Sequence, residues 1–195
     1  MTSDRKIICA VQGTQEAVDW LTNVKIRKTK YFGIHAHRGF VGAAQAILAE
    51  VESAIYSFPE YYQILVAGHS LGGGVGVLLS IGLQELMRMR AEQRRITLTT
   101  FGQPKVATSK ALRVFHGSYM RVQNGSDIVP RLPNVPGYYS HAGTNLYLPN
   151  KLPEPIINPS WSVRFKDRML TGFERLQDHS MDDYIKELRK CESVL

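Results

Sequence analysis

Apolar residues follow two different repeats along the chain, and the shorter repeat marks strands. The runs at 7–11 and 63–67 are largely apolar, and each ends at a glycine-containing turn, as strands of a parallel sheet do. Hydrophobic and polar residues alternate over 96–101 and 119–124, and 143–148 is a further strand candidate. We expect the first run to be buried on both faces, so that the chain opens inside the sheet.

The longer repeat marks helices between these strands. Apolar residues recur every three or four positions over 41–58 and again over 71–86, which predicts two amphipathic helices. A last helix over 180–190 begins with an N-cap arrangement of Ser180 and Asp183. Strands that alternate with helices predict an α/β fold, a mostly parallel central sheet flanked by helices, in which ligands bind at the carboxyl ends of the strands.

One domain over residues 1–195 is the organisation that the composition supports. The chain has 195 residues, of which 44% are hydrophobic, enough for one buried core. The helical and strand patterns lapse over 149–177, where four prolines disfavour regular structure, and we expect a flap there. We also expect a soluble, cytoplasmic or intracellular protein, because the chain starts without a signal-peptide core and Cys9 and Cys191 make no disulfide framework.

The formal net charge of +7 raises the question of a nucleic-acid partner. The densest basic patch is Lys25–Tyr31, and a second group of arginines over 88–95 ends a predicted helix, where cations complement the helix dipole. Neither forms a basic stripe with interleaved aromatic residues. We therefore expect no nucleic-acid partner.

The stretch Gly68–Gly72 has the pattern G-x-S-x-G between a predicted strand and a predicted helix. This is the pattern of a nucleophile elbow, in which a strained turn exposes the serine hydroxyl, here that of Ser70. Two other glycine-rich motifs do not match this stretch. A P-loop needs a lysine where Gly74 stands, and the dinucleotide fingerprint needs a glycine at Val77 or at Leu79.

A serine nucleophile needs a histidine base and a carboxylate that orients it, in the chain order serine, acid, histidine. Asp127 follows a predicted strand on the same edge of the sheet as Ser70, although a simple turn aspartate is the alternative. Two histidines follow Asp127. His141 lies 14 residues further on and enters a strand, which favours a structural hydrogen bond. His179 follows a long loop that can return to the serine, and we take it as the base.

The reaction also needs two backbone N–H donors for the developing oxyanion. The residue after the nucleophile, Leu71, supplies one. Thr14 is the candidate for the second, because Gly13 before it lets the backbone approach the serine. Thr14 as a plain helix N-cap is the alternative, and it is compatible with the first role. Such chemistry needs no metal and no cofactor.

Beyond these residues, seven blocks in order make the chain similar to class 3 lipases, the fungal-lipase-like branch of the α/β-hydrolases. The resemblance implies the triad Ser70, Asp127 and His179, the oxyanion donors Thr14 and Leu71, and a reduced α/β-hydrolase fold, because family members commonly carry further elements before the first strand here. Two departures, Gln12 where arginine is usual and Ala107 where glycine is usual, touch no catalytic atom. The blocks are Gly13-Thr14 with 19–23; 37–40; 68–73; 100–106; 121–122 with Asn124 and 127–133; Tyr139, His141 and Gly143; and Asp178-His179-Ser180 with Tyr184.

In this family the helix after the first of these strands serves as a lid, which here corresponds to residues 15–30. Trp20 and Leu21 lie on its apolar side, and the basic residues follow at once. One interpretation is a lid that makes peripheral contact with an anionic membrane or lipid-droplet surface. The other is that Trp20 and Leu21 are core residues.

The function that these residues predict is serine carboxylic-ester hydrolysis, with an acylglycerol or a related lipid ester as substrate. Alternatives within the same chemistry are a phospholipase and a feruloyl-type esterase. A catalytically idle scaffold or binding module with the same fold is the alternative outside enzymes, and the intact triad argues against it. The sequence does not determine an oligomeric state.

Overall fold

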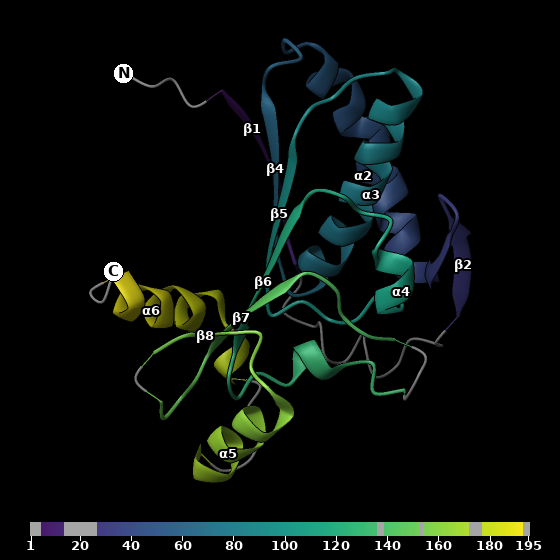
Figure 1. Cartoon of the computed structure of the whole chain (residues 1–195). Coiled ribbons are helices and arrows are strands. Elements are labelled where there is room, and N and C mark those ends of the chain that lie inside the picture. Colours follow the sequence, from purple (N-terminus) through teal and green to yellow (C-terminus); the bar gives the residue numbers. More distant parts are fainter. Residues whose placement is uncertain (1–4, 14–26, 136–138, 153, 172–176, 193–195) are drawn as a thin grey trace.

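The computed structural model describes residues 5–13, 27–135, 139–152, 154–171 and 177–192. They form a central sheet whose strands run parallel, except that the last is antiparallel to its neighbour (Figure 1). This confirms the predicted α/β class. In spatial order the strands are β1 (Lys6–Val11), β4 (Gln63–His69), β5 (Ile96–Phe101), β6 (Ser118–Asn124), β7 (Thr144–Leu148) and β8 (Ile156–Ile157).

Helices cover both faces of this sheet. α2 (Arg38–Tyr56) and α3 (Leu71–Met89) pack together on one side, and α6 (Met181–Glu192) lies on the other (Figure 1). Both long helices were predicted from the apolar repeat. None of the helices in the described ranges is long and apolar enough to cross a membrane.

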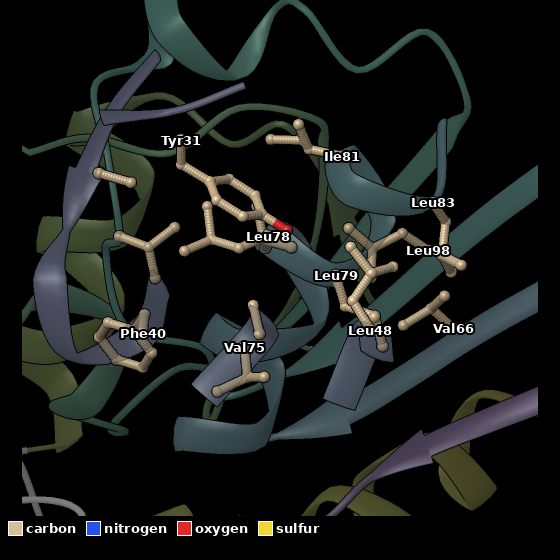
Figure 2. Packing of buried hydrophobic residues seen from close by; sticks show 14 of the residues in the cluster. Tyr31, Phe40, Leu48, Val66, Val75, Leu78, Leu79, Ile81, Leu83 and Leu98 are labelled. Carbon is tan, nitrogen blue, oxygen red and sulfur yellow. The ribbon is translucent and has the colours of Figure 1, made fainter. Parts of the chain in front are cut away.

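The main core lies between the α2–α3 pair and the sheet. Leu78 and Leu79 of α3 are fully buried with Val66 of β4 and Leu98 of β5, and Leu48 of α2 joins the same cluster (Figure 2). Burial of this many aliphatic side chains is the dominant favourable term for folding. The core thus fixes β4 and α3, the two elements that meet at Ser70.

The expectation that the first strand is buried on both faces is wrong. Within the described sheet β1 is an edge strand that pairs only with β4, and its residues alternate between exposed and half-buried. Ile7, Cys9 and Val11 pack against the core, whereas Ile8 on the other face is 65% exposed. An unbroken apolar run does not reveal on how many sides a strand is covered, because coverage depends on distant parts of the chain.

Residues 149–177 contain more regular structure than their prolines suggest. Besides β8, the segment forms α5 (Trp161–Thr171) and the short 3-10 helix η2 (Gln177–His179), so the expected absence of regular structure is wrong there. The hydroxyl of Ser160 accepts the N–H of Val163 and starts α5. The apolar repeat missed this helix because the residue that it buries is Asp167, not an apolar side chain.

A small hairpin and a short helix were also not predicted. β2 (Lys28–Tyr31) pairs with β3 (Ile34–His37) through a turn in which Phe32 and Gly33 both have positive φ, as a two-residue hairpin requires. Part of the basic patch therefore lies on a strand. The four-residue helix α4 (Ser109–Leu112) begins at an N-cap, Thr108. Elements of four residues are too short to establish a repeat.

Candidate active site

Ser70 occupies a strained turn between β4 and α3. Its backbone has φ 57° and ψ −128°, outside the regions that L residues prefer, and its N–H donates to the carbonyl of Phe101 over 2.9 Å. Gly68 and Gly72 allow the turn, because a Cβ on Gly68 would clash with Gly72 and one on Gly72 would clash with the Val11 carbonyl. The predicted sequence of strand, tight turn and helix is therefore present, and it aims the Ser70 side chain at the carboxyl edge of the sheet.

Asp127 lies in the turn after β6 and is completely buried. Its Oδ1 accepts the backbone N–H of Val129 over 2.9 Å. Its Oδ2 accepts two donors, Nδ1–H of His179 at 2.8 Å and the hydroxyl of Tyr184 at 2.6 Å. A buried carboxylate is stable only with such donors, and each of them also restricts its orientation.

His179 is held between this carboxylate and the residue that precedes the serine. Because its Nδ1 donates to Asp127, its Nε2 is the nitrogen left to accept a proton. The His69 ring lies 4.6 Å from the His179 ring, and His69 donates through Nε2 to the His179 carbonyl over 2.7 Å. Ser180 caps α6 by accepting the N–H of Asp183 over 3.1 Å, as predicted, and fixes the chain just after the imidazole.

Among the residues that the structure describes, two buried atoms of this cluster have no hydrogen-bond partner, Oγ of Ser70 and Nε2 of His179. An alcohol and an unprotonated imidazole nitrogen are the pair that general-base activation of a serine uses. In the absence of substrate such pairs commonly lack a well-aligned hydrogen bond, which forms in the reacting complex. The structure thus brings together Asp127 and His179 directly, and ties His179 to the serine through His69.

Of the two predicted oxyanion donors, the structure describes Leu71 and does not describe Thr14. Leu71 is the first residue of α3, so its N–H has no acceptor within the helix. The chain at Gly13 passes close to the serine, since a Cβ there would lie 3.1 Å from Cβ of Ser70. Thr14, and with it most of the segment 15–30 that includes Trp20 and Leu21, lies outside the described residues. The roles of Thr14, Trp20 and Leu21 stay predictions.

Residues 8–136 match the family model described as lipase (class 3). The chain belongs to the class 3 lipase family. It is 26% identical over 163 residues to a lipase of Rhizomucor miehei, an alignment that covers 79% of this chain and 45% of that protein. It is also 26% identical over 179 residues to phospholipase A1-II 6 of Oryza sativa subsp. japonica, which covers 73% of this chain and 43% of that protein.

Solved structures of lipases share the fold. The triacylglyceride lipase of Rhizomucor miehei superposes with a TM-score of 0.70 at 24% identity, covering 92% of this chain and 71% of that chain. The fold of this class 3 lipase family member is therefore that of the α/β-hydrolases, as the sequence resemblance implied. The chain spans less than half the length of the lipase of Rhizomucor miehei and of the phospholipase A1-II 6 of Oryza sativa.

Three residues around Asp127 and His179 were given no role by the sequence argument. Tyr184 and His69 stand in the family's blocks, but only the packing of α6 against β4 and β6 shows that they contact Asp127 and His179. Gly102, which follows β5, has φ +58°, and a Cβ there would lie 2.7 Å from Oδ2 of Asp127 and 2.8 Å from Cε1 of His179. In the sequence, the one sign of this role for Gly102 was that it is a glycine directly after a predicted strand that ends at the same edge of the sheet as Ser70.

The other histidine that follows Asp127 has a structural role, as expected. His141 donates through Nε2 to the carbonyl of Pro130 over 2.6 Å. Burial, together with the positive charge of Arg121, holds the pKa of His141 well below its usual value, so that the ring stays neutral. Burial and the nearby His179 likewise lower the pKa of His69, in keeping with a neutral ring that donates one N–H.

Two further features of the described residues bear on where a metal ion or a ligand could bind. The described residues contain no cluster of three or more histidine, cysteine or acidic side chains arranged to hold a metal ion. A cavity of about 560 Å³, lined in part by Arg88, Ile96 and Gly117, lies at the amino ends of β5 and β6. It contains no triad residue and is at the opposite edge of the sheet from the one where α/β folds bind ligands.

Proposed function

We propose that this protein is a serine carboxylic-ester hydrolase that acts on lipid esters of the acylglycerol type. One observation carries the proposal: the buried Asp127 carboxylate orients His179, whose Nε2 has no hydrogen-bond partner among the described residues, and Ser70 is held in a nucleophile elbow. Membership of the class 3 lipase family supports the same chemistry. The names of the two curated relatives, a lipase and a phospholipase, support a lipid ester as substrate.

The reaction begins with attack of the Ser70 Oγ on the ester carbonyl carbon, while its proton passes to Nε2 of His179. The Asp127 carboxylate accepts Nδ1–H of His179 and stabilises the imidazolium that forms. The tetrahedral oxyanion accepts hydrogen bonds from the N–H groups of Leu71 and Thr14, which contribute a few kcal/mol each to stabilisation of the transition state. Collapse of this intermediate breaks the ester C–O bond, and the alcohol leaves with the proton from His179.

Water then completes the cycle. His179 takes a proton from a water molecule, the hydroxide attacks the carbonyl of the acyl-Ser70, and collapse of the second tetrahedral intermediate releases the fatty acid. The proton on His179 returns to Oγ of Ser70. No electron transfer occurs and no metal or cofactor takes part in any step.

The direct test replaces the nucleophile. We expect Ser70→Ala to lower hydrolysis of a p-nitrophenyl butyrate substrate by roughly 10⁴-fold or more and to abolish labelling by a fluorophosphonate probe. Ser80→Ala is the matched control, because Ser80 is also a buried serine of the same region, in α3, and its hydroxyl only donates to the Gly76 carbonyl. Undiminished hydrolysis by Ser70→Ala would falsify the proposal.

The substrate class is tested on the unmodified protein. We expect fatty acid release from emulsified acylglycerols. A specific second candidate is phospholipase A1 activity, which the relative from Oryza sativa favours. Release of fatty acid from phosphatidylcholine with no release from acylglycerols would support the phospholipase and contradict the first assignment. Methyl ferulate serves as the substrate for the feruloyl-esterase alternative.

We further propose that the part of the segment 15–30 that precedes β2 acts as a lid over the serine, with Trp20 and Leu21 toward the lipid. Activity then rises when the ester substrate forms aggregates, because the lid opens at an apolar surface. Replacement of Trp20 and Leu21 by serine should remove that rise and leave hydrolysis of monomeric esters in place. A response to aggregation that persists in this variant contradicts the lid.

A further inference from the structure

The backbone of η2, which carries the base His179, is held by side chains from two strands. At the end of β6, Asn124 donates from Nδ2 to the carbonyl of Asp178 over 3.3 Å. At the end of β4, His69 donates from Nε2 to the carbonyl of His179 over 2.7 Å. Two consecutive carbonyls of η2 therefore accept hydrogen bonds from the carboxyl edge of the sheet.

These two hydrogen bonds connect the base to different partners in the reaction. The carbonyl of Asn124 accepts the N–H of Asp127 over 3.2 Å, so the contact from Asn124 fixes η2 relative to the acid. His69 directly precedes Ser70, so its contact fixes η2 relative to the nucleophile. His69 and His179 are 110 residues apart in the chain, and their hydrogen bond is therefore a tertiary link between two separate segments.

This link spans the distance across which the proton must move. In the described part of the chain, Oγ of Ser70 and Nε2 of His179 are buried without a hydrogen-bond partner. Proton transfer requires the two atoms to come within hydrogen-bond reach in the reacting complex. Their separation therefore depends on how β4 and η2 are held together, and a misplacement of about 1 Å can cost roughly 100-fold in rate.

The ring of His69 is itself held by its neighbours. It lies 4.6 Å from the ring of His179, with 31° between the two planes, and 5.9 Å from the ring of Tyr184. The register of β4 and β5 places Phe101 beside His69, and the ring of Phe101 lies 6.2 Å from that of Tyr184. A side chain that is packed in this way has little freedom, as a residue that positions another one requires.

The charge state of His69 also suits a position beside the base. In the described part of the chain, the ionisable groups that face it are His179 from η2, Asp127 from the turn after β6 and Tyr184 from α6. Burial first, and then the charge of His179, lower the pKa of His69. A neutral ring adds no positive charge next to the imidazolium that forms on His179 during hydrolysis.

We propose that His69 is a positioning residue for ester hydrolysis, whose Nε2–H holds the backbone of His179 so that the imidazole stays within reach of Ser70. His69 transfers no proton and does not touch the ester. The inference rests on the proposed function, because it assigns a role within the reaction of Ser70. A purely structural role for His69 would lower stability without a specific effect on kcat.

The test compares two amides of different reach at position 69. In His69→Gln the amide nitrogen is as many bonds from the main chain as Nε2 of the imidazole, so it can donate to the His179 carbonyl. In His69→Asn the amide nitrogen is one bond nearer to the main chain and falls short of that carbonyl.

Hydrolysis of p-nitrophenyl butyrate measures the difference between the two amides. We expect His69→Asn to lower kcat by roughly 10- to 100-fold with little change in KM, and His69→Gln to stay within about threefold of the wild type. Equal kcat values for the two variants would overturn the proposal, because they would show that the hydrogen bond to the His179 carbonyl has no effect on the reaction.

A control variant removes the same kind of hydrogen bond away from the site. Gln84 of α3 also donates from Nε2 to a backbone carbonyl, that of Val114, over 2.7 Å, and its Oε1 accepts the N–H of His116. Gln84→Met should lower the midpoint of urea unfolding and leave kcat unchanged, whereas His69→Leu should lower both. A loss of stability in His69→Leu with the wild-type kcat would make His69 purely structural and contradict the proposal.

A spectroscopic measurement tests the link without turnover. Nδ1–H of His179 donates to Asp127 over 2.8 Å, and a proton in such a hydrogen bond gives a far-downfield signal in the proton NMR spectrum. We expect this signal in the wild type and in His69→Gln, and a broadened signal in His69→Asn, because the backbone that carries the imidazole is less restrained. Equally sharp signals in all three proteins would refute the positioning role.

The two measurements separate this inference from the proposed function. A wild-type protein that hydrolyses no ester contradicts the proposed function, whereas the NMR signal still reports whether His69 holds His179 in place. A wild-type protein that hydrolyses esters, together with a fully active His69→Asn variant, leaves the proposed function standing and overturns the role of His69.

Discussion

The hydroxyl of Tyr184 lies 2.6 Å from Oδ2 of Asp127, the same oxygen that accepts Nδ1–H of His179 at 2.8 Å. One carboxylate oxygen therefore serves both the imidazole and a phenol from α6. The Tyr184 oxygen also accepts the N–H of Asn124 over 3.1 Å. Burial and the neighbouring carboxylate hold the pKa of Tyr184 well above its ordinary value, so it remains a donor throughout the working pH range. Tyr184 thus acts as a positioning residue for the carboxylate.

Removal of this hydroxyl is expected to affect both activity and stability. Tyr184→Phe deletes a donor to a charged group, an interaction worth about 1.5–3 kcal/mol, and leaves the N–H of Asn124 without this acceptor. We expect kcat/KM for a soluble ester to fall by roughly tenfold, with kcat changing more than KM, and the free energy of unfolding in urea to fall by about 1–3 kcal/mol. A variant that loses stability but keeps the wild-type kcat and pH profile would reduce Tyr184 to a purely structural residue.

Gly102 offers a test that separates backbone strain from contact with the triad. Gly102→Ala introduces a side chain at φ +58°, and its Cβ would lie 2.8 Å from Cε1 of His179. Gly33→Ala is the matched control, because Gly33 has φ +79° and nothing lies within 4 Å of its Cβ position.

Both alanine variants should lose stability by roughly 1–2 kcal/mol from the left-handed backbone. Only Gly102→Ala should also lower kcat/KM, by about 10-fold or more, because its side chain would displace a catalytic group. Thermal unfolding and ester hydrolysis, measured on both, check this. Equal activities of the two variants would mean that the imidazole tolerates displacement.

The neutral His141 predicts how stability depends on pH. Its folded pKa lies well below the ordinary value of 6.5, so between these values the unfolded chain binds a proton that the folded chain does not. Stability is therefore constant with respect to His141 above about pH 6.5 and falls as the pH drops below it, by at most about 1.4 kcal/mol per pH unit.

His141→Gln keeps a donor for the Pro130 carbonyl and removes the titration. We expect urea unfolding of this variant to show a shallower loss of stability from neutral to mildly acidic pH than the wild type. His37 and His69, whose pKa values burial also lowers, account for part of the slope that remains. A slope unchanged from wild type would place the proton uptake elsewhere.

Asp167 should be the residue that attaches α5 to the body of the protein. Asp167→Asn puts an NH₂ group or a weaker acceptor in front of the three donors from Tyr147, Asn150 and Lys151. We expect a loss of about 3 kcal/mol in the free energy of unfolding and faster cleavage by trypsin within 161–171. Glu154→Gln, which changes an exposed carboxylate, should alter neither. Wild-type protease resistance in Asp167→Asn would mean that other contacts hold the helix.

Much of the local structure around the site followed from the sequence. The elbow was predictable because the glycines at 68 and 72 and a serine between a strand and a helix describe one strained turn, and the cap at Ser180 was predictable because it involves neighbours three residues apart. Short elements such as β2 and α4 escaped because four residues are too few to establish a repeat. The helix α5 escaped because the residue that it buries is a carboxylate, Asp167, while its apolar residues Trp161, Phe165 and Met169 are exposed. The edge position of β1 escaped because coverage of a strand is not encoded within it.

By itself, therefore, the sequence determined the family, the α/β class and the order of serine, acid and histidine, since these depend on local backbone preferences and on motifs. Only the tertiary structure decided that Tyr184 and His179 meet at one oxygen of Asp127, that Gly102 leaves room for them, and that Asp167 of α5 meets donors from Tyr147, Asn150 and Lys151. These contacts join residues that are far apart in the chain. They exist only after the sheet and the helices have packed, because packing alone sets which distant side chains come within hydrogen-bond distance.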